Sequence, residues 1–147
     1  MAEIIALADA PDLIPVVAAW HWNEWGAGDP SGSLADWTEN LRRRSLKDRV
    51  PTSWVGLVAG LPAGSVALVE SDMSTHPELT PWLSGLFVLP EYRNAGVGSA
   101  LTAHCEAAAA RLGVGRLYLY TDTAAGFYAA RGWSVTVTSG TTAASRR

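Results

Sequence analysis

LSGLFVLPEYRNAGVGSALTAHCEAAAARL, residues 83–112, predicts a buried strand, a short turn and a long helix. The apolar run 86–89 is typical of a strand inside a sheet, and it ends at Pro90, which has no N–H to donate to a neighbouring strand. Gly113 ends the helix, as a residue that readily adopts positive φ commonly does. Within the helix the apolar residues recur at the spacing of one sheet-facing side; they are Val97, Leu101, Cys105, Ala108 and Leu112.

The turn before this helix, residues 93–99 (the glycine turn), has the sequence RNAGVGS. Its free backbone N–H groups and the positive end of the helix dipole favour an anion, and Gly96 and Gly98 let the backbone come close to one. One such dipole contact is worth only about 0.3–1 kcal/mol at an exposed site. Several N–H groups and Arg93 must therefore act together, and a pyrophosphate is large enough to meet them all.

Two common phosphate-binding motifs do not match this turn. A dinucleotide-binding motif requires a third glycine or alanine where this sequence has Leu101, and a P-loop requires a Gly-Lys-Ser/Thr that the sequence lacks. The order strand, Pro-Glu-Tyr-Arg, R-x-x-G-x-G and amphipathic helix instead resembles motif A of the GNAT superfamily of acyl-CoA-dependent N-acetyltransferases. Residues 117–133, LYLYTDTAAGFYAARGW, resemble motif B of the same superfamily.

The resemblance and the residue patterns together predict one α/β domain over residues 1–147, a GNAT-like mixed β-sheet flanked by helices in the order βααβββαβαβ. A first helix is expected up to about Trp25, with Asp9 or Asp12 as its cap, and residues 60–64 are expected to form a hairpin loop. Residues 139–147, SGTTAASRR, are polar and predict a disordered tail, so that the family's last strand is short or missing. Another chain would then supply that strand, or the fold would lack it.

The resemblance implies acetyl-CoA as co-substrate. Its pyrophosphate would lie on the glycine turn, and its pantetheine would pair like an added strand with the backbone of the central strand. The family often has an asparagine near the pantetheine at the start of the motif B helix, whereas this sequence has Thr121 or Asp122 there. The residues expected to bind acetyl-CoA are Leu86, Phe87, Val88, Arg93, Asn94, Ala95, Gly96, Val97, Gly98, Ser99, Thr121 and Tyr128.

The resemblance further implies an N-acetyltransferase, a transferase in which a primary amine of a small molecule, a protein N-terminus or a lysine attacks the thioester directly. A tetrahedral intermediate then expels the CoA thiolate. Tyr128 matches the family's general acid, because its phenol keeps its proton at pH 7. The alternative is a tyrosine packed in the core with its hydroxyl merely satisfied.

No motif marks the general base. Glu24 and the loop that contains Glu78 are preferred, because acceptors in this family bind between the first helices and the central strands. Trp22 and Trp25 flank Glu24 and are candidates for the wall of an acceptor pocket. The full set of candidate bases is Glu24, Glu70, Asp72, His76 and Glu78.

Composition limits the partners. A net charge of −3 argues against a nucleic acid, and residues 42–49, which hold four arginines and Lys47, are interpreted as a solvated helix face. The single cysteine, Cys105, excludes an intramolecular disulfide and is expected to be a buried small side chain. No apolar run is long enough to span a membrane and no histidine, cysteine or acidic cluster has metal spacing, so we expect no membrane contact, no metal and a cytoplasmic location.

Two other classes of function fit parts of the sequence. A non-catalytic acyl-CoA sensor would keep the glycine turn while the short C-terminus leaves the acceptor site open. A protein-interaction module would use the tryptophan-rich first helix and a sheet edge exposed by the missing strand. A homodimer with exchanged strands fits the enzyme hypothesis equally well. The sequence does not identify the amine, the preferred acyl chain or the oligomeric state.

Overall fold

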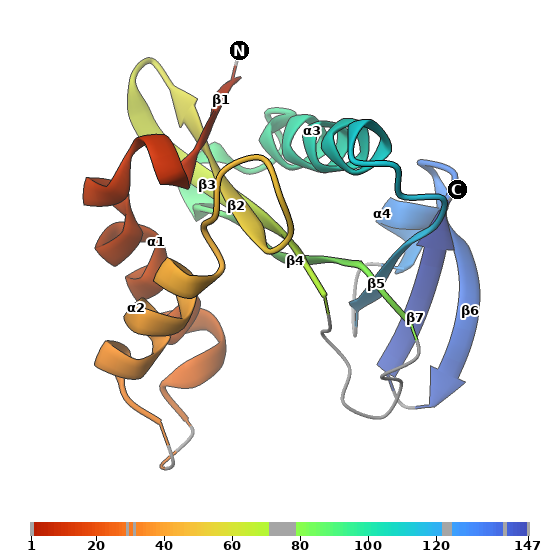
Figure 1. The fold of residues 1–147 in the computed structure, drawn as a ribbon, viewed down its shortest axis with the longest axis horizontal. Coiled ribbons are helices and arrows are strands. Elements are labelled where there is room, and N and C mark those ends of the chain that lie inside the picture. The colour runs from red at the N-terminus through yellow and green to blue at the C-terminus, as the bar shows by residue number, and fades with distance from the viewer. Residues whose placement is uncertain are drawn as a thin grey trace.

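The computed structural model describes residues 2–28, 30, 32–70, 79–121, 125–139 and 141–146. In these residues the strands form one sheet in the order β1-β2-β3-β4-β5-β7-β6 (Figure 1). The strands are β1 Ala2–Ala6, β2 Thr52–Val58, β3 Leu61–Val69, β4 Trp82–Val88, β5 Leu117–Thr121, β6 Ser134–Ser139 and β7 Thr141–Arg146. The helices are α1 Ile14–His21, α2 Leu34–Arg43, α3 Val97–Arg111 and α4 Ala125–Ala129.

Short helical turns connect several of these elements. Turns of 3₁₀ helix lie at η1 Leu7–Asp9, η2 Pro11–Leu13 and η4 Pro90–Tyr92, and a π-helical turn, η3 Trp22–Gly26, continues α1. None of the described helices is long and apolar enough to cross a lipid bilayer.

The predicted α/β class and the order βααβββαβαβ are confirmed, but the prediction of a missing last strand is wrong. β7 lies in the segment expected to be a disordered tail, and it pairs antiparallel with both β5 and β6. Its sequence, TTAASR, lacks the large apolar residues that predict a strand. Backbone pairing on both sides explains the strand, because β-propensity depends strongly on such context. This chain therefore supplies the strand itself.

Helices pack on both faces of β1–β4. Side chains alternate along β2, so that Trp54 joins the core under α3 whereas Val55 joins the core under α1 and α2. Figure 1 shows α1 and α2 on one side of these strands and α3 on the other. Cys105 of α3 is fully buried, as the helical stripe predicts, and burial raises the pKa of its thiol far above the ordinary value. A thiol in this state is not a nucleophile.

Most local predictions agree with the structure, and three do not. Leu112, predicted on the sheet-facing stripe, is the C-cap of α3 and 42% exposed. Ser33 caps α2, because the Asp36 N–H donates to its Oγ at 3.2 Å. No side chain caps the start of the first helix, and Asp9 instead forms an ion pair with Lys47. The hairpin loop predicted at 60–64 is shorter, because β3 already begins at Leu61. Ala59 and Gly60 both have positive φ, as the two central residues of a type I′ hairpin turn require.

A β-bulge at Gly85 shapes β4. Ser65 of β3 lies opposite Phe87 and Ala67 lies opposite Ser84, so β4 contains one extra residue at this point. Gly85 has φ +62°, the left-handed conformation in which a glycine costs least. Beyond its first residue β4 leaves its other neighbour: the described register with β5 is the single parallel pair Trp82↔Tyr118. The two strands therefore diverge toward their C-terminal ends.

Gly64 permits the close approach of β3 and β4. A Cβ at this position would lie 2.6 Å from the Phe87 carbonyl oxygen, a backbone atom that cannot move aside without breaking the ladder. We expect Gly64→Ala to lower the free energy of unfolding by about 1–3 kcal/mol, as overpacking does. Urea unfolding followed by tryptophan fluorescence measures this change. Gly115→Ala is the matched control, because a Cβ there meets no atom within 4 Å; equal midpoints for the two variants would contradict the prediction.

Candidate active site

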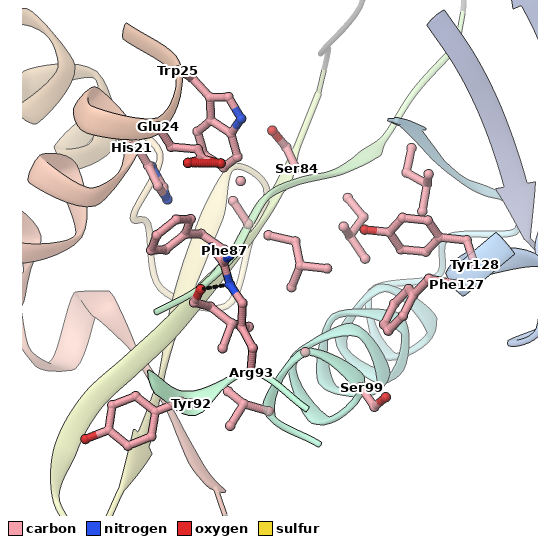
Figure 2. Close-up of a pocket in the computed structure, with 18 of the residues that line it drawn as sticks. His21, Glu24, Trp25, Ser84, Phe87, Tyr92, Arg93, Ser99, Phe127 and Tyr128 are labelled. Atoms are coloured by element: carbon pink, nitrogen blue, oxygen red, sulfur yellow. Dashed lines mark hydrogen bonds between the residues drawn. The ribbon is translucent and has the colours of Figure 1, made fainter. Parts of the chain in front are cut away.

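The diverging strands β4 and β5 open a cleft of about 1130 Å³. Figure 2 shows His21, Glu24 and Trp25 on one side of it, Phe127 and Tyr128 on the other, and Ser84 and Phe87 of β4 between them. Elements that are far apart in sequence thus meet in one space. The other lining residues are Trp37, Asn40, Leu41, Arg44, Ala67, Leu83, Gly85, Leu86, Val88, Tyr92, Arg93, Asn94, Gly96, Val97, Gly98, Ser99, Leu119 and Arg131.

The glycine turn lies at the N-terminus of α3, on the cleft. Gly96 is the N-cap with φ +84°, no side chain caps the helix, and the first intrahelical bond runs from the Ala100 N–H to the Gly96 carbonyl at 3.0 Å. The N–H groups at the start of the helix are thus available to an anion. A Cβ at Gly96 would meet no atom within 4 Å. Glycine is therefore favoured here by the positive φ and not by lack of space for a side chain.

Arg93 turns back onto β4. Its Nε donates to the Val88 carbonyl at 2.8 Å, the dashed line in Figure 2, and its guanidinium carbon lies 5.7 Å from the Phe87 ring centroid. These contacts hold the cation beside the helix N-terminus.

The cleft-facing edge of β4 supplies backbone groups. Leu89 donates its N–H to Ala63 of β3 at 2.9 Å, so the Val88 carbonyl of the same trans peptide unit faces away from β3, toward the cleft. Residues alternate between the two edges, so Leu86 has the same orientation as Val88. This edge is the place where the sequence predicts the pantetheine to pair.

Tyr128 lies on α4 with its hydroxyl directed into the cleft (Figure 2). Only 7% of the residue is exposed, and its ring contacts those of Phe127 and Trp133. Burial, opposed by the nearby positive charge of Arg131, raises the pKa of Tyr128 to about 12. The phenol therefore keeps its proton at pH 7 and is a hydrogen-bond donor.

Arg131, which sequence reasoning did not select, joins α4 to the glycine turn. Its Nε and one terminal nitrogen donate to the Ser99 hydroxyl at 3.1 and 2.6 Å, and its other terminal nitrogen donates to the Phe127 carbonyl at 2.8 Å. Its guanidinium carbon also lies 3.6 Å from the Phe127 ring centroid. Arg131 is part of the motif B segment, but only the fold shows that it reaches α3.

His21, also missed, fixes α1 against the bulge in β4. The Ser65 hydroxyl donates its only proton to the Gly85 carbonyl at 2.9 Å, so it accepts a hydrogen bond from His21 Nε2 at 2.8 Å. Burial above all, and also the positive charge of Arg44, lower the pKa of His21 to about 4, while a hydrogen bond to the Gly85 backbone opposes this shift. The imidazole is therefore neutral at pH 7, with its proton on Nε2.

Glu24 and Trp25 project from the π-helical turn η3 into the cleft. Trp25 is 49% exposed, and its ring meets those of His21 and Phe87 at centroid distances of 5.1 and 6.2 Å. Trp22 does not line the cleft; its ring packs edge-on against Trp37, which does. Of the two tryptophans that flank Glu24 in sequence, only Trp25 faces the candidate acceptor side.

The remaining predicted site residues have different outcomes. Ala95 lies on the glycine turn but does not line the cleft, and Glu70 is exposed at the end of β3, also away from it. Thr121 is the last residue of β5, and its side chain is outside the described part of the structure. The proposed base Glu78 and the candidates Asp72 and His76 lie outside the described residues, as does Asp122.

His21 makes stability depend on pH. Its pKa is about 4 in the folded protein and about 6.5 in an exposed chain. Between pH 4 and 6.5, His21 is therefore mostly protonated in the unfolded chain and mostly neutral in the folded protein. The free energy of unfolding should therefore fall as the pH is lowered from 6.5 to 4. We expect His21→Gln to make the thermal unfolding midpoint depend less on pH in this range. Thermal unfolding followed by circular dichroism at several pH values measures this dependence. His104 lies outside the cleft, and partial burial also lowers its pKa, so His104→Gln is the comparison and should change the slope less than His21→Gln. An unchanged slope in His21→Gln would contradict the assignment.

Comparisons with known proteins agree with this geometry. The acetyltransferase (GNAT) family model matches residues 14–133. A GCN5-related N-acetyltransferase from Ralstonia eutropha is 26% identical, with a TM-score of 0.66 and coverage of 95% of this chain and 96% of that one. Ard1 from Thermoplasma volcanium is 18% identical, with a TM-score of 0.72 and coverage of 99% and 96%.

A third similar structure contains the cofactor. The PaiA N-acetyltransferase of Thermoplasma acidophilum, in complex with coenzyme A, is 20% identical, with a TM-score of 0.67 and coverage of 100% of this chain and 99% of that one. A comparison with curated proteins gave no match. The family match covers most of the chain, and the fold and cleft agree with it: the chain belongs to the GNAT family of acetyltransferases.

Proposed function

We propose that this protein transfers an acetyl group from acetyl-CoA to a primary amine. One observation supports this most strongly: the helix N-terminus of the glycine turn and the Tyr128 hydroxyl line the same cleft, with the free edge of β4 between them. These three features suit the pyrophosphate, the departing sulfur and the pantetheine of one extended molecule.

The residues present fit acetyl-CoA. The N–H groups of Val97, Gly98 and Ser99 at the start of α3 suit phosphate oxygens, and Arg93 and Arg131 add positive charge on either side. Leu86 and Val88 offer backbone groups to the pantetheine amides. We therefore assign cofactor binding to the glycine turn and β4.

The reaction we propose is a direct displacement. The neutral amine nitrogen forms a bond to the thioester carbonyl carbon, the tetrahedral intermediate collapses, and the carbon–sulfur bond breaks. The electron pair leaves with the CoA sulfur, and the Tyr128 hydroxyl donates to the resulting thiolate. The proton lost by the amine passes to a carboxylate or to water.

Glu24 is the proposed acceptor of that proton, directly or through water. Of the two candidate bases among the described residues, Glu24 lines the cleft and Glu70 does not, which supports this choice. Its task depends on the amine. Deprotonating an α-amine at pH 7 costs about 1 kcal/mol, whereas deprotonating a lysine costs roughly 4.6 kcal/mol at 1.36 kcal/mol per pKa unit. An α-amine therefore needs far less from the protein.

Calorimetric titration of the purified protein with acetyl-CoA, and separately with NAD, tests the proposal. We expect micromolar binding of acetyl-CoA and none of NAD, followed by thiol release when an acceptor amine is present. Folded protein that does not bind acetyl-CoA would refute the proposed function.

Gly96→Glu should abolish acetyl-CoA binding, because it places a negative charge where a phosphate is proposed to lie. The positive φ of residue 96 also strains any side chain, so the matched control is Gly96→Asn, since asparagine tolerates this conformation better than most residues and is uncharged. Calorimetry of both variants separates charge from strain. Unchanged affinity in Gly96→Glu would remove the glycine turn from the binding site.

Tyr128→Phe should lower kcat by about a hundredfold or more, the usual contribution of a positioned proton donor, with little change in acetyl-CoA affinity. Tyr118→Phe is the control, because that ring packs on Trp82 and does not line the cleft. Thiol-release kinetics give kcat, and calorimetry gives affinity. If turnover of Tyr128→Phe equals that of the control variant, Tyr128 is only a packing residue.

A further inference from the structure

One face of α2 lines the cleft on the side of His21, Glu24 and Trp25, which we call the acceptor side. Its lining residues recur at intervals of three or four, the spacing of a single helix face; they are Trp37, Asn40, Leu41 and Arg44. The first three belong to the helix and Arg44 is its C-cap. This wall combines apolar surface with one amide and one cation.

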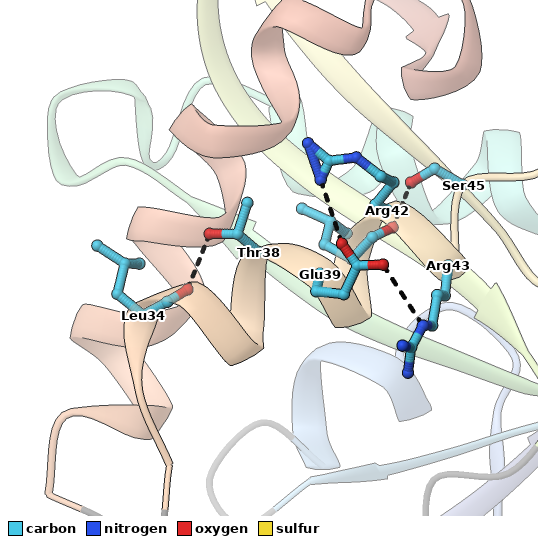
Figure 3. A network of polar contacts seen from close by, with 7 residues as sticks. Leu34, Thr38, Glu39, Arg42, Arg43 and Ser45 are labelled. Atoms are coloured by element: carbon cyan, nitrogen blue, oxygen red, sulfur yellow. Dashed lines mark hydrogen bonds and ion pairs between the residues drawn. The ribbon is translucent and has the colours of Figure 1, made fainter.

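Arg44 differs from its basic neighbours. Figure 3 shows Arg42 and Arg43 paired with Glu39, at 3.7 and 3.6 Å, on the exposed face of α2. Lys47 pairs with Asp9. Within the part of the chain that the structure describes, no carboxylate pairs with Arg44. Arg44 is thus exposed, as predicted for this basic segment, but it lines the cleft, and no carboxylate of the described residues pairs with it.

Arg44 is an exposed residue that lines the cleft together with His21. After burial, its positive charge is the next cause of the lowered pKa of His21. A positive charge in this position attracts a carboxylate and repels a second ammonium group.

The turn η3, which packs against α2, carries the opposite charge into the same cleft. Glu24 of η3 lines the cleft between His21 and the exposed ring of Trp25 (Figure 2). A carboxylate beside aromatic rings suits an ammonium group. The α2 face and η3 together suit a molecule that carries one charge of each sign.

We propose that the acceptor is a primary amine with a carboxylate a few bonds away, its ammonium group beside Glu24 and its carboxylate on Arg44 and Asn40. This substrate class rests on the proposed acetyltransferase function. Two sources share the chemistry: a free α-amino acid, and a peptide whose first residue is acidic. The same arrangement disfavours polyamines.

Thiol release from acetyl-CoA with matched acceptors tests the proposal on the full-length protein. Phenylalanine is compared with phenylalaninamide, and the dipeptide amide aspartyl-phenylalaninamide with asparaginyl-phenylalaninamide. Spermidine serves as the polyamine. We expect the member of at least one pair that carries the carboxylate to have a KM about ten- to a hundredfold lower than its amide, and spermidine to be a poor acceptor. The pair that shows the difference identifies the source.

Arg44→Met should raise KM for the carboxylate acceptor by the same factor, with little change in kcat and no change in KM for the matched amide. Arg44→Lys should recover part of the loss, because it keeps the charge without the guanidinium fork. Arg43→Met, which loses only the exposed pair with Glu39, is the control and should behave as the unmodified protein.

Equal KM values for carboxylate and amide in both pairs would overturn the substrate class. So would turnover of spermidine faster than that of the carboxylate acceptors, or no turnover of either carboxylate acceptor. An equal effect of Arg44→Met on both members of a pair would overturn it as well. Calorimetry distinguishes the two levels of failure. If the protein binds acetyl-CoA but has equal KM values for carboxylate and amide acceptors, only this inference is refuted. If the protein does not bind acetyl-CoA, the proposed function is refuted.

Discussion

The unequal pairing of β4 determines this structure. Along one edge β4 follows β3, while along the other it meets β5 at its first residue and then diverges. A strand edge without a neighbour presents unpaired N–H and C=O groups, which proteins normally cover. Here the free edge faces a cleft, and the Arg93 side chain already occupies one of its carbonyl groups. The geometry favours an extended ligand that completes the sheet.

The bulge at Gly85 connects this edge to the helices. The bulged Gly85 carbonyl accepts from Ser65, and Ser65 in turn accepts from His21 of α1. A Cβ on Gly85 would lie 3.3 Å from the His21 ring, a tight contact, and the φ of +62° would strain any side chain, so both favour glycine here. Through these contacts one irregular residue in β4 fixes the position of the turn that carries Glu24 and Trp25.

The two walls of the cleft belong to different parts of the molecule. Tyr128 packs in the core that α3 forms with the sheet, whereas α1 and α2 pack in a separate core on the other face. β4 lies between them and contributes to the first core through Leu83. The glycine turn and Tyr128 thus lie on one side, and the proposed acceptor residues Glu24 and Arg44 lie on the other, so the acceptor side can vary without disturbing the glycine turn.

Local chemistry explains what could be predicted from the sequence. Pro90, the two glycines and the apolar stripe that ends before Gly113 act through backbone conformation and helical periodicity, so the strand, the glycine turn and α3 follow from nearby residues alone. The order of elements follows from similar patterns, whereas Tyr128 is identified through the resemblance of residues 117–133 to motif B.

Only the tertiary structure decided the rest. β7 exists because β5 and β6 pair with it, although TTAASR has little strand character of its own. Arg44 separates from Arg42 and Arg43 because it projects from the side of the helix that lines the cleft, whereas they project toward Glu39. His21 and Arg131 became site residues through partners 44 and 32 residues away in the chain, a separation at which sequence periodicity says nothing.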